Sequence, residues 1–313
     1  MIDILIPTYN REQDLVKNIL YLNKLVENEG LQGKFRLIVS NNASIDNTEQ
    51  ELESIKSKIS LEIVVYTQNH NIGLEKNAVF TLENATSDYV MFLGDDDYLP
   101  EGYLSKVVDI VNKNEIGVII PRFVGLYSDG TIKDGRQDFN MREKQAGFMS
   151  VLDLSEYGHQ LSGLVFKREG VIENYLSDEN NRNIYLFIFF ITYGLLRYRS
   201  VYLPQFAVKV TQSNSKDWNY DDSGLLTEIY KNYQSIFKNN RIKKILASLN
   251  LTLQQRWRFR FGVNPIGSLK ALRHILLSNI DSDIKISLIV AYPLFYALAV
   301  SRFIKNLIIR RMV

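Results

Sequence analysis

The chain has 313 residues, 46% of them hydrophobic and 12% aromatic, which is enough to bury one large core or two smaller ones and excludes a disordered or fibrous protein. It has no cysteine, which excludes disulfides, thiolate zinc sites and cysteine nucleophiles, and its three histidines argue against a histidine-rich metal site. The net charge is only +2, but residues 241–313 contain thirteen lysines and arginines against two acids, so a basic tail follows an acidic body.

Apolar runs and amphipathic segments alternate over the first 120 residues. The short, β-branched runs predict strands at 2–7, 35–40, 61–66, 88–93 and 116–120. The segments with helical spacing are 12–28, 46–59, 73–85 and 101–113. This alternation predicts an α/β fold with a mostly parallel sheet covered on both faces, in which ligands bind at the carboxyl ends of the strands. The first ten residues match a strand and show no secretory signal.

A polar motif follows each of the first four predicted strands. The motifs are PTYNR (7–11), SNNASIDNT (40–48), NHNIG (69–73) and GDDDY (94–98). Because the carboxyl ends of parallel strands meet at one edge of a sheet, we expect the four motifs to line one crevice.

Three consecutive aspartates in the fourth motif place like charges side by side. On an extended segment Asp95 and Asp97 would share a face about 6–7 Å apart and repel each other by about 2–3 kcal/mol. A hard divalent cation removes this penalty and also accepts phosphate oxygens. The alternative is a solvated acidic turn that caps the helix after Pro100.

The order and spacing of the four motifs resemble the nucleotide-sugar-binding half of family 2 glycosyltransferases, which have the GT-A fold. The resemblance covers residues 2–125 closely and 126–215 in outline. It implies a catalytic domain over 1–222, with a nucleotide-sugar half (1–125) and an acceptor half (126–222), followed by a basic, apolar helical region over 223–313.

The resemblance also implies where the nucleotide-sugar binds. Residues implied for the pocket are Pro7, Thr8, Tyr9, Arg11, Asn41, Asn42, Ser44, Gly73, Lys76, Asp95 and Asp96. The resemblance implies a UDP-sugar, because the family usually has an acid at position 41 that reads the base. Its replacement by Asn41 weakens this assignment without removing it, since an amide can still accept from a uracil N–H and can also donate. Lys76 replaces the usual arginine and meets phosphate as a point charge. In the alternative interpretation, Ser44 or Asp46 simply caps the next helix.

GDDDY corresponds to the DxD motif of the family. The metal ligands are then Asp97 and Asp95, or Asp97 and Asp96 if the motif is shifted by one residue. Either pair would hold Mg²⁺ or Mn²⁺ against the two phosphates of the donor.

The resemblance implies inverting transfer, in which a carboxylate removes the proton of the acceptor hydroxyl. The family takes this base from an acidic pair at the start of a helix, and the nearest acids here are Asp178 and Glu179. His159 is a second candidate. A surface loop and a structural histidine are the alternatives. Ser162 and Gly163 resemble the small residues on the acceptor side of the family.

The second half has weaker patterns. Residues 123–135 predict a hairpin around Asp129-Gly130, 161–169 a strand, 183–196 a buried helix, and 201–210 two strands separated by Pro204. Residues 211–222 predict a polar loop, in which Lys216 and Trp218 could reach the donor.

The tail combines apolar and basic residues. Residues 286–300 are apolar but shorter than the ~20 residues that span a bilayer, and basic residues alternate with apolar ones in 254–262 and 301–313. These patterns predict peripheral binding to an anionic membrane on the cytoplasmic face. A helical cap on the catalytic domain is the alternative. Nucleic acid is not expected as a partner, because no known binding motif accompanies the charge.

Together these patterns predict a metal-dependent, inverting glycosyltransferase that moves a sugar from a nucleotide-sugar to a saccharide or lipid-linked acceptor in cell-surface polysaccharide synthesis. One alternative is a sugar nucleotidyltransferase, which would need a glycine-rich loop after the first strand that PTYNREQ lacks. The other is an inactive, membrane-bound scaffold of the same fold. The oligomeric state does not follow from the sequence.

Overall fold

A computed structural model of the chain describes residues 1–113, 115–212, 225–256, 258–259 and 264–312, and for Asn181, 225–226 and 302–312 the backbone alone. Its strands are β1 (Ile2–Thr8), β2 (Phe35–Asn41), β3 (Glu62–Thr67), β4 (Tyr89–Phe92), β5 (Ile116–Leu126), β6 (Ile132–Asp134), β7 (Arg142–Lys144), β8 (Val165–Lys167) and β9 (Arg199–Thr211). Its helices are α1 (Glu12–Asn28), α2 (Thr48–Ile55), α3 (Leu74–Glu83), α4 (Tyr103–Asn112), α5 (Phe148–Leu154), α6 (Val171–Leu176), α7 (Leu186–Arg197), α8 (Leu225–Glu228), α9 (Lys231–Ile236), α10 (Arg241–Gln254), α11 (Pro265–Leu277) and α12 (Ser282–Met312), with short 3₁₀ turns η1 (Ser155–His159) and η2 (Glu179–Asn181).

One mixed sheet organises the chain, in the order β3-β2-β1-β4-β8-β5-β9-β7, with β6 paired to β5. The first four strands in this order are parallel, as predicted. The short strand β8 runs antiparallel between β4 and β5, and β9 is parallel to β5. The carboxyl ends of β1, β2, β3 and β4 therefore lie at one edge, and each is followed by one of the polar motifs.

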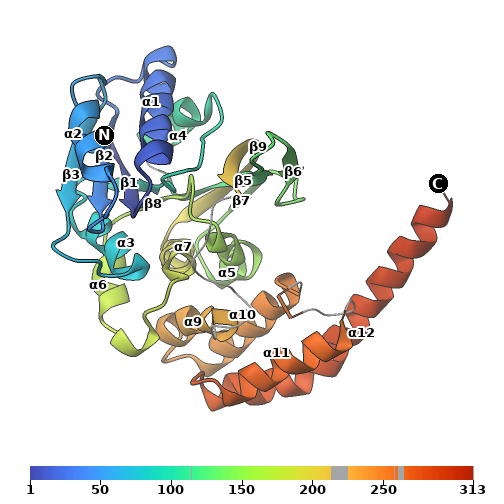
Figure 1. Ribbon diagram of the computed structural model, residues 1–313. Coiled ribbons are helices and arrows are strands. Elements are labelled where there is room, and N and C mark those ends of the chain that lie inside the picture. Colours follow the sequence, from blue (N-terminus) through green and yellow to red (C-terminus); the bar gives the residue numbers. More distant parts are fainter. Residues whose placement is uncertain (114, 213–224, 257, 260–263, 313) are drawn as a thin grey trace.

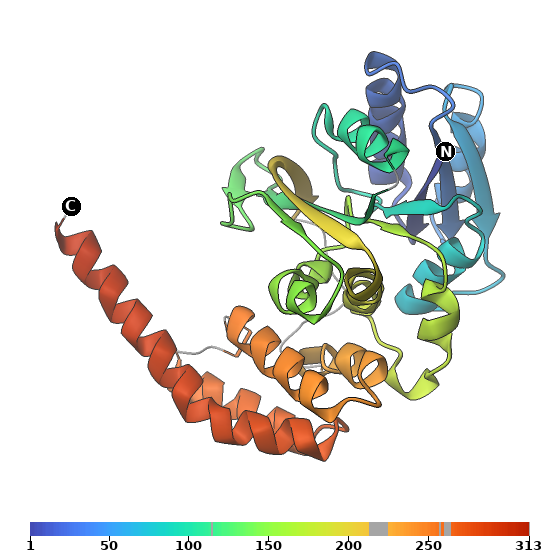
Figure 2. The ribbon, with the colours of Figure 1, turned by 180° about the vertical axis from the view of Figure 1, so that it is seen from behind.

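Helices cover both faces of the sheet (Figures 1 and 2). Alternate residues of β1 serve the two faces: Ile4 and Ile6 join the core under α1, α2 and α4, whereas Leu5 joins the core under α3 and α7. A nearly continuous apolar run thus forms a strand that is buried on both sides.

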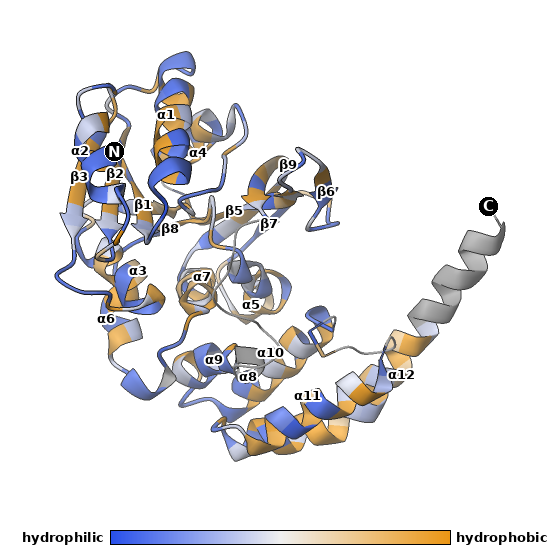
Figure 3. Cartoon of the chain, viewed as in Figure 1, coloured by the Kyte–Doolittle hydropathy of each residue, from blue (hydrophilic) through white to orange (hydrophobic). Residues whose placement is uncertain are grey.

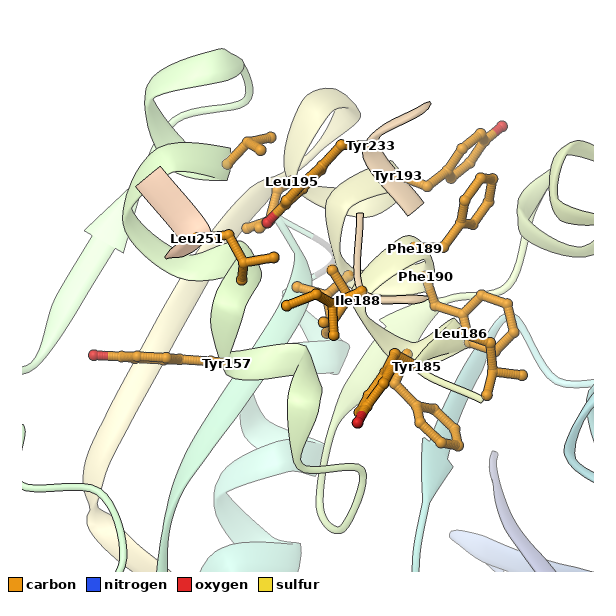
Figure 4. Packing of buried hydrophobic residues seen from close by; sticks show 14 of the residues in the cluster. Tyr157, Tyr185, Leu186, Ile188, Phe189, Phe190, Tyr193, Leu195, Tyr233 and Leu251 are labelled. Carbon is orange, nitrogen blue, oxygen red and sulfur yellow. The ribbon is translucent and has the colours of Figure 1, made fainter. Parts of the chain in front are cut away.

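The larger core is built around α7, in which every residue from Leu186 to Leu195 is buried. Figure 4 shows Phe189 and Phe190 packed beside Leu186 and Ile188, with Leu251 of α10 in the same cluster. The tail also makes polar contacts with this region, since Asn250 Nδ2 donates to the Leu152 carbonyl at 2.6 Å. The helices after residue 224 therefore share a core with α5 and α7.

The hairpin over 123–135 is confirmed, because β5 and β6 pair antiparallel on either side of the turn. The expected strand pair at 201–210 is wrong. The chain forms the single strand β9, in which Leu203 and Ala207 face the consecutive residues Pro121 and Arg122. Pro204 lies in the resulting bulge, where its missing N–H costs no ladder hydrogen bond. Most of the predicted loop at 211–222, with Lys216 and Trp218, lies outside the described residues.

Candidate functional site

The three aspartates lie on a tight turn, so the expected extended geometry is wrong. The Asp97 N–H donates to the Gly94 carbonyl at 3.3 Å and closes the turn. Asn18 of α1 stabilises this turn, because its Nδ2 donates at 2.8 Å to the carbonyl oxygens of both Gly94 and Asp97. Two adjacent like charges are easier to tolerate on a turn, where their side chains diverge toward different partners.

Asp95 points toward the end of β1. Its Oδ2 accepts a hydrogen bond of 2.7 Å from the Thr8 hydroxyl, and the side chain is partly exposed. Burial and then the negative charge of Asp96 raise the pKa of Asp95 to about 7, against the opposing effects of the Thr8 hydroxyl and Arg11. The surrounding groups therefore do not stabilise the ionised form of Asp95 enough to offset burial and the charge of Asp96.

Asp97 points the other way and is buried. Its Oδ1 accepts from the Thr211 N–H at 2.9 Å, and its Oδ2 accepts from the Ser162 hydroxyl. Burial, followed by the charge of Asp96, raises the pKa of Asp97 to about 7. Gly94 is required beside it, since a Cβ there would lie 2.8 Å from Asp97 Oδ2.

The turn fits a cation that takes few ligands from the protein. Among the described residues no group of three or more acidic or histidine side chains gathers around one point, so a complete protein cage is not formed. Asp95 and Asp96 are adjacent and partly exposed, and the charge of Asp96 raises the pKa of both neighbours. Such a donor set suits Mg²⁺ or Mn²⁺ with its remaining positions open to phosphate oxygens.

The loops after β1 and β2 are locked together. Asn10 and Ala43 both have left-handed backbones, with φ of 52° and 57°. The Asn10 N–H donates to Ser44 Oγ at 2.9 Å, and Asn10 Oδ1 accepts from the Ile45 N–H at 2.9 Å. Ser44 therefore joins the loops and does not cap α2. Strained non-glycine residues at strand ends are typical of binding sites.

Asn41 and Asn42 have different surroundings. Asn41 is fully buried; its Oδ1 accepts from the Ser44 N–H at 3.0 Å, and its Nδ2 has no hydrogen-bond partner among the described residues. Asn42 is satisfied at both atoms, donating to Asn71 at 2.9 Å and accepting from the Ile72 N–H at 2.8 Å. A buried donor without a partner costs about 1–3 kcal/mol, so Asn41 Nδ2 is a donor for which the described residues supply no acceptor.

The third motif begins α3. Gly73 has φ of 87°, which favours glycine, and precedes the first turn. Lys76 is exposed and has no ion pair in the described part of the chain, so its ammonium can meet an anion. Its neighbour Glu75 binds Arg182 through two hydrogen bonds of 2.9 and 3.0 Å. This ion pair holds the segment after α6 against the start of α3.

That segment contains Asp178 and Glu179. Both precede α7, whose first turn has no acid, and Asn183 Oδ1 accepts from the Tyr185 N–H at 2.8 Å at its start. The Arg182–Glu75 pair ties the segment that contains the two acids to the start of α3.

His159 lies in a polar network at η1. Its Nδ1 is 2.7 Å from the Glu156 carbonyl oxygen and 3.1 Å from Gln255 Nε2. Burial and the positive charge of Arg136 lower its pKa to about 3, so at neutral pH it holds a proton poorly.

Comparison with known proteins identifies the family of the chain. The model of "Glycosyl transferase family 2" matches residues 3–171, more than half of the chain. The chain belongs to this family. It is 30% identical to an abequosyltransferase, RfbV, of Salmonella typhimurium over 34% of this chain and 31% of that protein. It is 26% identical to a GalNAc(5)-diNAcBac-PP-undecaprenol beta-1,3-glucosyltransferase of Campylobacter jejuni over 49% of this chain and 52% of that one.

Solved structures show the same fold. TarS (1-349) of Staphylococcus aureus in complex with UDP-GlcNAc superposes with a TM-score of 0.64 at 17% identity, covering 88% of this chain and 80% of that one. The mannosyltransferase PcManGT of Pyrobaculum calidifontis, in complex with GDP-Man and Mn²⁺, gives 0.56 at 16% identity, covering 98% and 86%. The predicted family and GT-A fold are confirmed, and the chain is placed among the glycosyltransferases.

Two residues of this family 2 site did not emerge from the sequence. Thr211 binds the Asp97 carboxylate from 114 positions away, which no local pattern reveals. Asn18 occupies a buried position within the apolar stripe of α1 between Leu15 and Leu22. A polar residue on such a stripe was a usable signal, because buried polar groups are almost always hydrogen-bonded.

Proposed function

We propose that the protein is a metal-dependent, inverting glycosyltransferase that moves a sugar from a nucleoside diphosphate sugar to a saccharide or lipid-linked acceptor in cell-surface polysaccharide synthesis. The observation that carries the proposal is the Asp95–Asp97 turn, where three adjacent acids, two of them with raised pKa values, meet the ends of β1 and β9. The named functions of the relatives support it, since they include an abequosyltransferase and a glucosyltransferase named for an undecaprenol-linked saccharide.

The three aspartates have two roles in this proposal. Asp95 and Asp96 hold the divalent cation, which supplies positive charge to the leaving diphosphate. Asp97 fixes the turn, because both its oxygens already accept protein hydrogen bonds. Direct ligation by Asp97 stays a prediction from the sequence.

Other residues bind the donor and activate the acceptor. Arg11 and Lys76 provide positive charge for the phosphates, while Pro7, Tyr9, Asn42, Ser44 and Gly73 stay predictions for the rest of the nucleotide pocket. Asp178 or Glu179 removes the proton of the acceptor hydroxyl as that oxygen attacks the anomeric carbon. His159 is not proposed as the base that removes this proton, because its lowered pKa makes it a weak base.

Titration calorimetry with a panel of nucleotide-sugars, with and without Mn²⁺, tests the proposal. We expect one donor to bind in a Mn²⁺-dependent manner and to lose that dependence in the Asp96→Asn variant. Absence of metal-dependent binding would instead favour the inactive scaffold. Pyrophosphate release from a nucleoside triphosphate and a sugar phosphate would favour the nucleotidyltransferase.

We further propose that α11 and α12 lie on the cytoplasmic surface of an anionic membrane. Within the described residues, one helix segment, Ser282–Ser301, is long enough and apolar enough to cross a membrane, by length and composition only. Its mean hydropathy is 1.8, and 28% of it is buried in the protein. Its buried stripe packs on the protein through Ile284, Leu288, Tyr292, Phe295 and Ala299. Since one face is occupied, the helix is better suited to lie on a membrane than to span it.

The opposite stripe is apolar and exposed. Its residues are Ile286, Val290, Leu294 and Leu298 on α12, with Ile266, Leu269 and Leu277 on α11. Figure 3 shows apolar residues along both helices at the edge of the molecule. Contiguous exposed apolar surface of this kind marks an interaction site.

The charge of the tail favours anionic lipid. Its two acids, Asp281 and Asp283, both pair with Lys244, so they neutralise little of the remaining basic charge. Lys270 and Arg273 are exposed on α11 beside the apolar residues. Each basic residue near an anionic surface contributes about 1 kcal/mol of attraction.

The Val290→Asp/Leu294→Asp variant is expected to lose at least about tenfold of its binding to vesicles of phosphatidylglycerol and phosphatidylcholine, because two charges would enter the apolar interface. Flotation at low salt measures the bound fraction. The control is Ile132→Asp, which adds a charge at an exposed apolar position on β6. Equal flotation of wild type and double variant would contradict the proposal. Truncation near Asn240 is unsuitable, because it would remove α10 from the core.

A further inference from the structure

The inference concerns the base of the donor and starts from the amide of Asn41. An asparagine amide has one acceptor and two donors, and here the neighbouring backbone fixes its orientation. The Ser44 N–H is a donor, so the atom 3.0 Å from it must be the amide oxygen. The buried Nδ2, with no partner among the described residues, is then the group left for a ligand.

The position of Asn41 places this donor in the site. Asn41 is paired in register with Thr8 on the parallel strand β1, so the two side chains leave the same face of the sheet. The Thr8 hydroxyl meets Asp95 on that face. Ser40 points to the other face, where its hydroxyl donates a hydrogen bond of 2.7 Å to Asn77 Oδ1. Of these two neighbours on β2, Asn41 is the one that shares a face of the sheet with the Thr8–Asp95 contact.

The family resemblance implies that position 41 meets the base of the donor. A hydrogen-bond donor there would select between the two pyrimidines uracil and cytosine. Ring nitrogen N3 of cytosine is an acceptor, whereas N3 of uracil carries a hydrogen and is a donor. A carboxylate at this position would pair with uracil N3–H, and the amide oxygen of Asn41 could have done the same had Ser44 not taken it. Two donors facing each other in a dehydrated site are strongly disfavoured.

We propose that Asn41 Nδ2 donates to N3 of cytosine, so that the donor is a cytidine diphosphate sugar in preference to a uridine diphosphate sugar. This proposal rests on the proposed function and replaces the uridine favoured by the sequence. The interaction is a recognition contact and moves no proton or bond.

The Asn41→Asp substitution is a close test, because aspartate has the shape of asparagine and can still accept from the Ser44 N–H. The change replaces the Nδ2 donor by an acceptor oxygen. Calorimetric titration with CDP and with UDP, each with Mn²⁺, gives the ratio of the two Kd values. We expect wild type to bind CDP at least about tenfold more tightly than UDP, and Asn41→Asp to reverse the preference.

Asn47→Asp is the matched control. It makes the same chemical change at an exposed position six residues along the same loop, so the added negative charge is the same. Its ratio of Kd values should equal that of wild type. Circular dichroism spectra should be the same for all three proteins.

The outcomes separate this proposal from the proposed function. Tighter binding of UDP by wild type would overturn the cytidine assignment and leave the proposed transferase standing; that result would place Nδ2 against a carbonyl oxygen of uracil. An unchanged ratio in Asn41→Asp would also overturn it. If neither nucleotide nor any nucleotide-sugar binds with Mn²⁺, the proposed function itself fails. The wild-type ratio decides the question even if the variant does not fold.

Discussion

Asp96→Asn is expected to lower the rate of metal-dependent glycosyl transfer by about 10²–10³-fold, because the variant loses the charge that holds the cation against the leaving diphosphate. Asp96 is the central charge of the turn. Of the charged groups around Asp95 and Asp97, it has the largest effect in raising the pKa of each. The amide has nearly the same size, so the turn closed by Gly94 and Asp97 should persist. The measurement is kcat with the donor identified by calorimetry.

Asp109→Asn is the control for this experiment, since Asp109 is exposed on α4 and outside the site. Its rate should match that of wild type within twofold. Thermal unfolding of Asp96→Asn without metal should occur at or above the wild-type temperature, because removal of one charge relieves the repulsion in the turn. A fully active Asp96→Asn enzyme would exclude the proposed metal role of this residue.

Phe190→Ala is expected to lower the free energy of unfolding by about 3–5 kcal/mol, the largest stability effect that we predict. Phe190 is fully buried at the centre of α7. Its ring centroid lies 5.5 Å from that of Phe166 on β8 and 6.0 Å from that of Phe92 on β4, so its removal leaves a cavity between helix and sheet. Partial relaxation of such a cavity does not recover the lost contacts.

Urea denaturation followed by circular dichroism measures this effect. Phe139→Ala is the matched control: Phe139 is 61% exposed and lies over Arg122, so its removal should cost at most about 1 kcal/mol. A loss below about 1.5 kcal/mol for Phe190→Ala would show that α7 is not the packing centre of the protein.

The sequence by itself determined the first half of the fold and the edge of the sheet at which its polar motifs meet. Apolar runs of the kind in β1 and β2 form strands through local sterics and burial on both faces, and the polar motifs that follow them mark the ends of those strands. Parallel strands then bring the motifs to one edge. For this reason GDDDY, PTYNR and SNNASIDNT could be assigned to one edge of the sheet in advance, where they contact one another, and the family could be predicted and then confirmed.

Only the tertiary structure decided which atoms of those motifs are available. The turn at Gly94, the insertion of β8 between β4 and β5, and the bulge at Pro204 depend on partners far along the chain. Thr211 and Ser162 occupy the oxygens of Asp97, and the Ser44 N–H occupies the oxygen of Asn41. A sequence names each donor and acceptor but does not pair them, because packing chooses the partners. The Asn41 amide has an oxygen that could accept from uracil and a nitrogen that could donate to cytosine, and among the described residues only the nitrogen is left without a partner.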